Sequence, residues 1–524
     1  MATGAELGYN INASAMQMAN AIFGNGVTVL SASYQGDNRS SAIYSNGNAL
    51  SPGVVPSDTG VILSTGYAAS FTQSSGDPNR STGTSTNTSG LNNDPLFNAI
   101  AGTNTYDASI LNVDFIPTGN VMTMNFVFSS EEFPEYAASQ FNDMIGVWVN
   151  GTHVPISFGS GNPSVGNING PGGNLLVSNT NDAFNTEMDG FTLTLSLTIP
   201  VNSGQVNSIR IGIADVSDSS YDSNLLIAAD SVQTVLVAAD DAATAYVSGD
   251  KVLNVLANDV NNTGGTLTIT HINGVAVTAG QTVNLPSGDS VTLNANGTLT
   301  VHTDADADEF SFSYTVSSSS GQTDVGMVTI STIPCFVAGT RIRTPAGEVA
   351  VETLKPGDLV MTHDDGAQPL RWIGQRSVAA EGAFAPIRIL AGTFGKHGTL
   401  LVSPQHRVMI RNSFAELLFG DAEVLVAAKD LVDGHAVRIS EGGTVDYVHL
   451  LFDKHQVVYS EGLPTESFLP GPQTTGSFEN ELVEELRALF PGIDPMTGEG
   501  YSPAARRALK AYEAKVLMAG RQAA

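Results

Sequence analysis

The sequence predicts a mainly β protein with two β-sandwich domains, a C-terminal all-β module and a short helical tail. Two observations predict this fold class. Short apolar or alternating runs recur through residues 1–334, separated by turn residues and without long helices between them, which is typical of sandwiches. The composition then changes abruptly at Cys335, the only cysteine in 524 residues, and six of the nine histidines follow it.

Length and charge limit the classes of partner. A chain of 524 residues favours about three domains, and its 42% apolar content is enough for packed cores. Residues 1–334 hold 4 of the 22 basic and 28 of the 51 acidic residues. Such a surface repels nucleic acid and anionic membranes, so we expect neither as a partner. No run of 18 apolar residues occurs, so we expect no membrane-spanning segment.

Residues 1–237 are predicted to form the first β domain. A partial apolar stripe predicts an opening helix over residues 10–22, and residues 73–95, rich in Ser, Thr, Asn and Gly, are expected to form a long loop. The first basic residue is Arg39, so a Sec signal peptide is not expected. The predicted strands are Val27–Tyr34, Gly60–Leu63, Ile110–Ile116, Val121–Phe128, Met144–Val149, Phe191–Ile199, Ser208–Ala214 and Leu225–Ala229.

Two acidic clusters follow predicted strands of this domain. Ca²⁺ takes six to eight oxygen ligands, and loops at strand ends can bring several carboxylates together. Neither cluster has EF-hand spacing, so on the pattern alone solvated loops are the preferred interpretation and a metal site is the alternative. The candidate Ca²⁺ ligands are Glu131, Glu132, Glu135, Asp143, Asp215, Asp218 and Asp222.

Both clusters resemble the signature segments of the bacterial choice-of-anchor L domain, found in cell-surface and secreted proteins. The resemblance spans about residues 8–237 and is concentrated in residues 129–143 and 214–223. It implies a surface-associated module and identifies no ligand.

Residues 238–334 are predicted to form a second, smaller sandwich. Seven short strand candidates lie there, separated by Asn-Gly, Gly-Gly and similar turns. This number and spacing of strands is typical of an Ig-like domain. The stretch resembles the cadherin-like repeats of bacterial adhesins, with Asn258, Asp259 and the acidic run 304–309 as candidate Ca²⁺ ligands. A plain spacer explains the same pattern and is the preferred interpretation.

The chemistry of the chain centres on Cys335. As the first residue of a new domain, its thiol lies next to the carbonyl of Pro334. Attack there converts the amide to a thioester by an N-to-S acyl shift, helped by effective molarities of about 10⁵–10⁸ M. A thiol of pKa ~8.5 needs a base, and the departing amine needs an acid, for which histidine is the first choice. The histidines after Cys335 are His363, His397, His406, His435, His449 and His455.

The stretch from residue 335 to about 468 resembles a Hint module, the horseshoe-like self-processing fold of hedgehog C-terminal domains and inteins, and most closely its bacterial type 2 variant. By this resemblance Cys335 is the nucleophile, and Ser403 and His406 replace the Thr-x-x-His pair that polarises and protonates the scissile amide. His455 matches a residue that assists resolution, and Asp358 is either catalytic or a turn residue. The motifs are Cys335–Ile342, Val351–Asp358, Pro369–Gly374, Leu401–Val408 and Glu461–Phe468.

One departure from splicing inteins stands out. The His-Asn pair that releases an intein is replaced by Glu466-Ser467, and the chain continues. Ligation is therefore not expected; water or an external nucleophile resolves the thioester and yields fragments 1–334 and 335–524. Residues 469–524 are expected to be a capping tail with helices over 478–490 and 502–518.

Two functions remain open on the sequence. The first is a secreted or surface protein of a bacterium, exported without a Sec signal and with type I secretion as the candidate route. It cleaves itself at Pro334–Cys335 with its own N-terminal part as substrate and with no cofactor. The second is a non-enzymatic, Ca²⁺-binding, adhesin-like surface protein with an inactive Hint scaffold. The intact set Cys335, Ser403 and His406 favours the first.

Overall fold

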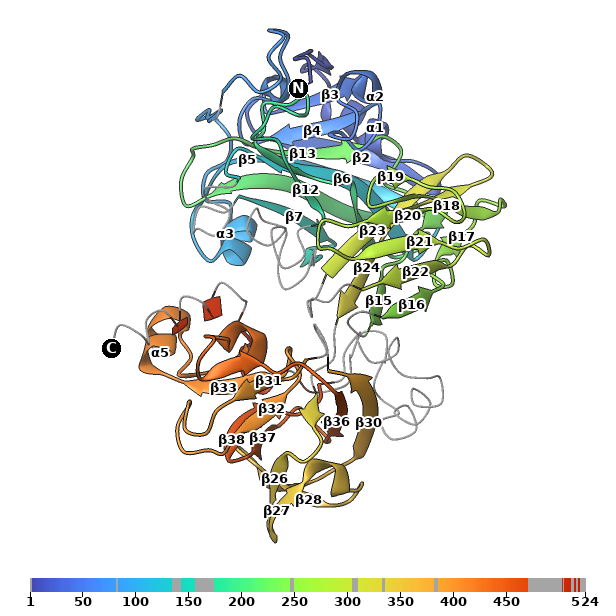
Figure 1. Cartoon of the computed structure of the whole chain (residues 1–524). Helices are drawn as coiled ribbons and strands as arrows, with labels where there is room; N and C mark the ends of the chain where they lie inside the picture. The colour runs from blue at the N-terminus through green and yellow to red at the C-terminus, as the bar shows by residue number, and fades with distance from the viewer. Residues whose placement is uncertain are drawn as a thin grey trace. The chain divides into compact units, whose positions relative to one another are not determined.

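The computed structural model describes residues 2–81, 83–133, 143–155, 174–245, 249–303, 310–331, 335–380, 385–469, 502, 504–509, 513–514 and 517–518. The chain is mainly β, as predicted (Figure 1). It divides into two compact units, one of Met1–Asp241, Val252–Val301 and Glu309–Thr329 and one of Ala242–Lys251, His302–Asp308 and Ile330–Ala524. Within the described residues, no helix has the length and apolar character needed to cross a bilayer.

The N-terminal part of the first unit is a sandwich of two antiparallel sheets. The larger follows the order β1-β3-β4-β13-β6-β10-β9, with β11 also paired to β6, and the smaller is β2-β5-β12-β7-β8. The strands are β1 (Gly8–Asn10), β2 (Val27–Gln35), β3 (Ser41–Ser45), β4 (Gly60–Ser64), β5 (Thr105–Pro117), β6 (Val121–Ser130), β7 (Met144–Val149), β8 (Thr152–His153), β9 (Leu176–Ser178), β10 (Gly190–Thr192), β11 (Leu195–Pro200), β12 (Asn207–Val216), β13 (Ser223–Ala228) and β14 (Leu236–Val237).

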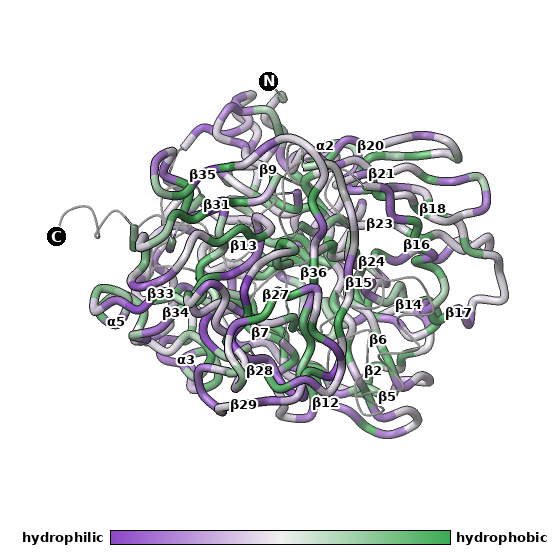
Figure 2. The backbone as a smooth tube through the Cα atoms, turned by 60° about the horizontal axis from the view of Figure 1, so that its bottom comes forward, coloured by the Kyte–Doolittle hydropathy of each residue, from purple (hydrophilic) through white to green (hydrophobic). Residues whose placement is uncertain are grey.

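Strand β6 shows why this sandwich needs two apolar layers. Its alternate residues Met122, Met124 and Phe126 enter the core shared with β5 and β12, whereas Val127 enters a second apolar cluster with Phe71 and Phe191. A strand buried on both faces has an almost continuous apolar sequence instead of alternation. Figure 2 shows hydrophobic and hydrophilic residues interleaved along strands elsewhere in the chain, as expected for strands with one buried face.

Short helices complete this part. Helix α1 (Ala15–Ile22) begins later than predicted because Ser14 and Gln17 form a capping box that fixes its start. The others are α2 (Gly47–Leu50), η1 (Ala68–Phe71) and α3 (Pro95–Ala101), of which α3 falls just after the predicted loop. The predicted strand over 191–199 is two strands, β10 and β11, which pair with different parts of β6.

The central part has the predicted Ig-like character. Strands β24, β23, β18 and β19 lie side by side in one sheet, and β22, β21 and β20 in another. Phe310, Phe312 and Tyr314 of β23 are fully buried. The strands are β15 (Asp241–Thr244), β16 (Asp250–Leu253), β17 (Val260–Asn261), β18 (Leu267–Ile272), β19 (Val275–Ala276), β20 (Thr282–Asn284), β21 (Ser290–Leu293), β22 (Leu299–His302), β23 (Phe310–Ser318) and β24 (Thr323–Ser331).

The second unit is dominated by the C-terminal module, which contains two sheets. One follows the order β30-β36-β25-β32-β31-β35; the other is β27-β26-β37-β38-β33-β34, with β28 paired to β29 and β37. The elements are β25 (Phe336–Val337), β26 (Arg341–Thr344), β27 (Gly347–Ala350), η2 (Val351–Thr353), β28 (Leu359–Thr362), β29 (Gly366–Pro369), β30 (Trp372–Ala379), β31 (Ile387–Ile389), β32 (Leu400–Val402), β33 (Arg407–Arg411), α5 (Ser413–Phe419), β34 (Glu423–Ala427), η4 (Ala428–Leu431), β35 (Val437–Ile439), β36 (Thr444–Leu451), β37 (Val457–Ser460) and β38 (Leu463–Glu466).

The helix predicted over 502–518 is only partly correct. Residues 513–514 and 517–518 are helical, but residues 504–509 are extended or bent, because Ala508 forms a β-bridge with Leu425 of β34. The helix predicted over 478–490 lies outside the described residues.

Candidate active site

Strand β25 places Cys335 between two neighbouring strands. Phe336 of β25 pairs with Val402 of β32 and with Val448 of β36, both antiparallel. In antiparallel strands the preceding residue of one chain faces the following residue of the other. The register therefore sets Cys335 opposite Ser403 on one side and His449 on the other. Cys335, the single cysteine of the chain, is only 6% exposed.

Ser403 binds the backbone of the nucleophile. The Cys335 N–H donates to Ser403 Oγ at 2.8 Å. The Ser403 N–H donates in return to the Cys335 carbonyl at 2.9 Å. The first contact involves the nitrogen of the Pro334–Cys335 amide, the bond predicted to break. Ser403 thus contacts the predicted scissile amide at its nitrogen. The sequence pattern had instead paired Ser403 with the carbonyl of that amide or with His406.

His449 is the residue that sequence reasoning missed. Its Nε2 lies 3.5 Å from Cys335 Sγ, and its side chain is buried, with 3% exposure. A buried imidazole beside a thiol is the group that can accept the thiol proton. One signal was available: His449 is the sole ionisable residue in the apolar run Val448–Phe452, where an unpartnered imidazole is costly to bury.

His406 lies in the same buried region. The centre of its ring lies 4.3 Å from that of Phe336, and the His406 backbone N–H donates to the Ser403 carbonyl at 3.0 Å. Among the described residues, neither ring nitrogen has a hydrogen-bond partner, although the side chain is 1% exposed. Pro334, which carries the predicted scissile carbonyl, lies outside the described residues.

The pKa of His406 is lowered to about 4, mainly by burial, and the nearby charges of His449 and Arg407 act in the same direction. The Glu466 carboxylate and the Cys335 backbone oppose this shift. His406 is therefore neutral in the resting protein at pH 7. An imidazole that lacks partners next to a nucleophile is suited to exchange a proton with a group that becomes more basic during reaction.

His455 belongs to a second buried cluster around Glu466. His455 Nε2 lies 3.1 Å from the Ser467 carbonyl and 3.6 Å from Glu466 Oε2. Glu466 is fully buried and also accepts from Arg407, whose N–H lies 2.9 Å from Oε1. Because Glu466 affects the pKa values of both His406 and His455, it links the two histidines electrostatically.

Comparison with known families assigns this module. The Hint domain family matches residues 334–472. This part of the chain is a Hint domain. The choice-of-anchor L domain family matches residues 9–233, and the bacterial Ig domain family matches residues 227–331. The two N-terminal resemblances are thereby confirmed, the central domain as a bacterial Ig domain, and this composition indicates a surface-associated protein.

Solved structures similar to part of the chain include inteins. The bacterial intein-like domain from Clostridium thermocellum shares 17% identity, with 25% of this chain and 97% of that chain covered and a TM-score of 0.19. The gp41-1 intein shares 11% identity over 25% of this chain and 97% of its own, with a TM-score of 0.17. No curated protein matches the chain.

The other candidate of the Hint domain, Asp358, does not join Cys335. It is exposed, and its carboxylate accepts a hydrogen bond of 2.8 Å from the Lys355 N–H. This contact closes a turn before β28, the alternative that the sequence had left open. The Hint site thus gathers Cys335, Ser403, His406 and His449, with His455 in the adjoining Glu466 cluster.

The two acidic segments of the choice-of-anchor L domain do come together. Glu132 Oε2 accepts from the Asp143 N–H at 3.1 Å, and Asp143 accepts from the Val216 N–H at 3.2 Å. The Glu131 N–H donates to the Asp222 carbonyl at 3.2 Å. Asp218 is half-buried, and Glu135 lies outside the described residues. In the part of the chain that is described, no three of these side chains converge as metal ligands.

Burial dominates the ionisation of this acidic cluster. It raises the pKa of Glu131 to about 8 and that of Asp222 to about 7. For Asp143 the value is about 8 and for Glu132 about 10, where the Asp143 charge adds to burial; Asp215 is raised well above its ordinary range. Three buried carboxylate oxygens of this cluster have no hydrogen-bond partner among the described residues: Glu131 Oε2, Asp215 Oδ1 and Asp222 Oδ2.

Proposed function

We propose that the Hint domain cleaves its own chain between Pro334 and Cys335. The observation that carries the proposal is the position of Cys335, whose amide nitrogen and thiol each face a different polar side chain. Ser403 Oγ lies 2.8 Å from the nitrogen and His449 Nε2 lies 3.5 Å from the sulfur. A structural cysteine needs neither contact.

The reaction is an N-to-S acyl shift. The Cys335 sulfur loses its proton to His449 and attacks the Pro334 carbonyl, forming a carbon–sulfur bond. The carbon–nitrogen bond then breaks and the Cys335 nitrogen gains a proton, so that a thioester and an amine result. Because both reacting groups belong to one chain, no encounter entropy opposes the attack.

His406 is the group suited to protonate the departing nitrogen. Because its pKa is about 4, it begins neutral and must receive the proton that the thiol gives up. The Cys335 backbone and the His449 charge both influence the pKa of His406, which places the three groups in one electrostatic environment. Net proton movement is then from sulfur to nitrogen, and no external acid is consumed.

Release requires a nucleophile from outside. Glu466 and Ser467 stand where a splicing intein carries His-Asn, and neither can cyclise to release a flanking segment. Water or an added thiol or hydroxylamine therefore resolves the thioester, and the passenger 1–334 separates from 335–524 without ligation. The choice-of-anchor L and Ig domains favour a passenger exported to the cell surface.

Intact mass after expression tests the proposal. The parent chain and a Cys335→Ala variant are compared with and without hydroxylamine. We expect fragments that end at Pro334 and begin at Cys335 from the parent only, and a hydroxamate on the passenger when hydroxylamine is present. A parent that stays full length under every condition would refute autoprocessing.

A second candidate function is a Ca²⁺-dependent surface module. We infer it from the buried oxygens of Glu131, Asp215 and Asp222, which have no hydrogen-bond partner among the described residues. Because the described side chains do not converge as a formed site, binding requires rearrangement of the cluster. Calorimetric titration of the chain with Ca²⁺, with Mg²⁺ as the comparison ion, tests it: no heat of binding would remove this candidate.

A further inference from the structure

The described residues of the C-terminal segment, which are 502, 504–509, 513–514 and 517–518, are built into the Hint fold. Ala508 bridges Leu425 in parallel, the Leu425 N–H donates to the Arg507 carbonyl at 2.8 Å, and the Leu509 N–H donates to the Leu425 carbonyl at 2.8 Å. Strand β34, which contains Leu425, is the last strand of its sheet. The segment therefore covers an edge that would otherwise expose unpaired backbone groups.

Apolar contacts hold the segment in place. Leu509, Ala514 and Leu517 are buried in the same apolar core as Phe336 and Val448, the residues that hold β25 against β36. Because burial of leucine side chains stabilises an apolar core, docking of the segment is coupled to the stability of the core around Cys335.

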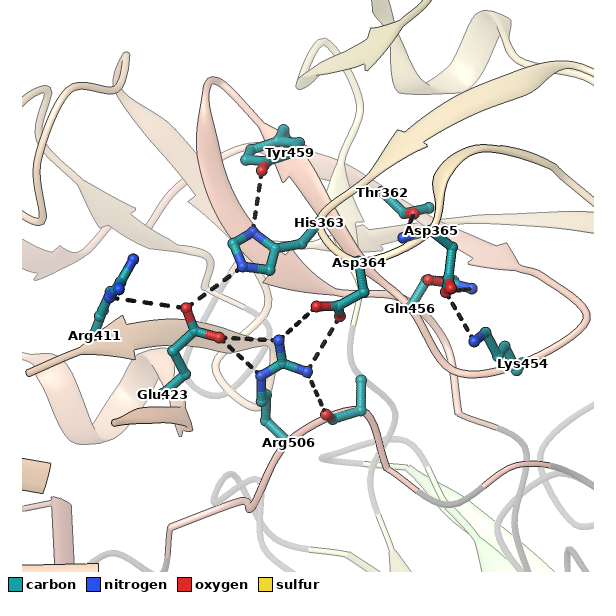
Figure 3. A network of polar contacts seen from close by, with 11 residues as sticks. Thr362, His363, Asp364, Asp365, Arg411, Glu423, Lys454, Gln456, Tyr459 and Arg506 are labelled. Atoms are coloured by element: carbon teal, nitrogen blue, oxygen red, sulfur yellow. Dashed lines mark hydrogen bonds and ion pairs between the residues drawn. The ribbon is translucent and has the colours of Figure 1, made fainter. Parts of the chain in front are cut away.

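An arginine fixes the register of the segment. Figure 3 shows Arg506 between two carboxylates, Asp364 and Glu423. Its Nη2 lies 2.6 Å from Asp364 Oδ1 and 2.9 Å from Glu423 Oε2. Two-sided guanidinium–carboxylate contacts give directional as well as electrostatic stabilisation. Glu423 also faces His363, whose Nε2 is 3.5 Å from Oε1.

The segment also contacts His455 directly at two points. The His455 backbone N–H donates to Ser502 Oγ at 2.7 Å, and the Ala505 N–H donates to His455 Nδ1 at 2.9 Å. A nitrogen that accepts from an N–H carries no proton, so the ring proton is on Nε2. That nitrogen faces the Ser467 carbonyl at 3.1 Å, where it donates.

We propose that the C-terminal segment is a positioning element of the processing site, in which the Ala505 N–H fixes His455 as the Nε2–H tautomer and Arg506 holds Ala505 in place. The effect of the segment on cleavage rests on the proposed autoprocessing, whereas the tautomer of His455 does not. Because its Nε2–H points at the Ser467 carbonyl, His455 does not compete for the Glu466 carboxylate. That carboxylate accepts from Arg407 and acts electrostatically on His406. Release of the segment removes the hydrogen bond to His455 Nδ1, so the ring is no longer held in the Nε2–H tautomer.

The surroundings of His455 determine the direction in which its pKa should change when the Ala505 contact is lost. Glu466 and Arg407 affect its pKa in opposite directions, and burial lowers that pKa. Loss of the Ala505 contact removes a hydrogen bond that only the unprotonated Nδ1 can accept, and a displaced segment also admits water. Both changes move the His455 pKa up toward its ordinary value of about 6.5.

Nitrogen NMR of the histidine rings tests the tautomer in chains that cannot cleave. The background is Cys335→Ala, and the variants are Ala505→Pro, which removes the donor, and Ala505→Gly, which keeps it. We expect His455 to stay Nε2–H in the background and in Ala505→Gly, and to become a tautomer mixture with a raised pKa in Ala505→Pro. Identical tautomers in all three chains would overturn the proposal.

Arg506→Ala serves where Ala505→Pro disturbs the fold, with Arg388→Ala as its control, because Arg388 is an exposed arginine of β31. Arg506→Ala should reproduce the tautomer mixture and Arg388→Ala should not; the reverse outcome overturns the proposal. In the Cys335 chain, cleavage should fall on the order of tenfold to a hundredfold for Arg506→Ala only. A parent that never cleaves contradicts autoprocessing, whereas the NMR result still decides the role of the segment.

Discussion

Cys335 Sγ lies 3.5 Å from His449 Nε2 in the Hint domain. The two residues are 114 positions apart, and the pairing of β25 with β36 brings them opposite each other. A thiol and an imidazole in contact form the unit that generates a thiolate near neutral pH. This pair sets the first prediction.

Replacing His449 by alanine should slow cleavage by about 10²–10⁴-fold, the usual contribution of a positioned general base. Rates are measured by intact mass in a time course after denatured chain is refolded. His435→Ala is the matched control, because His435 is an exposed histidine of the same domain. Equal rates in the two variants would show that the thiol is activated by another group.

Ser403→Ala should destabilise the Hint domain. The change leaves the buried N–H of Cys335 without its acceptor, which costs about 1–3 kcal/mol. Urea unfolding in the Cys335→Ala background measures the free energy of unfolding without interference from cleavage. Ser403→Thr retains the hydroxyl and should lose less stability and retain cleavage; if Ser403→Thr is as damaging as Ser403→Ala, the hydroxyl is not the important group.

Acid should destabilise the Hint domain through His406. Its pKa is about 4 in the folded protein and about 6.5 when unfolded. Between these values the unfolded chain binds more protons, so stability is full above pH 6.5 and falls as the pH drops toward 4, by about 3 kcal/mol. His406→Gln should flatten this part of the stability profile. The same steep loss in that variant would assign it to other groups.

The choice-of-anchor L domain should show the opposite trend. Glu131 and Asp222 have folded pKa values of about 8 and about 7, above their unfolded values of about 4. Here the folded state holds more protons, so stability present at pH 4 is lost as the pH rises to 8. Thermal unfolding of the chain at pH 5 and 8 measures this.

Added Ca²⁺ should raise the melting temperature at pH 8 more than at pH 5, because it replaces the missing protons. Glu131→Gln, which keeps the shape of the side chain, should reduce both the pH dependence and the Ca²⁺ effect; Asp58→Asn, at a carboxyl outside the cluster, should change neither. A melting temperature indifferent to Ca²⁺ at both pH values would leave protonation as the sole means of neutralising these side chains.

Much of the fold could be predicted from local patterns. Strand β7 was predicted with its bounds because apolar runs and turn residues are local signals. Strands β3 and β10 were missed or merged, because their limits are set by pairing with distant strands. The start of α1 depends on a contact between Ser14 and Gln17 that periodicity alone does not show.

The site divides in the same way. Cys335, Ser403 and His406 lie in recognisable motifs and the structure brings them together. His449 required the register of β36 against β25, which depends on pairing across more than a hundred residues. The convergence of Glu132 with Asp143 and Val216 likewise follows from the order of the sheets and not from either segment alone.

The contact of Cys335 with Ser403 also bears on the thioester intermediate of the proposed reaction. In that intermediate Cys335 has a free amine in place of the amide nitrogen, which in the uncleaved chain lies 2.8 Å from Ser403 Oγ. That amine is the natural acceptor for return of the acyl group from the thioester. Cleavage is then reversible until the thioester is intercepted, and the yield depends on the supply of nucleophile more than on the speed of attack.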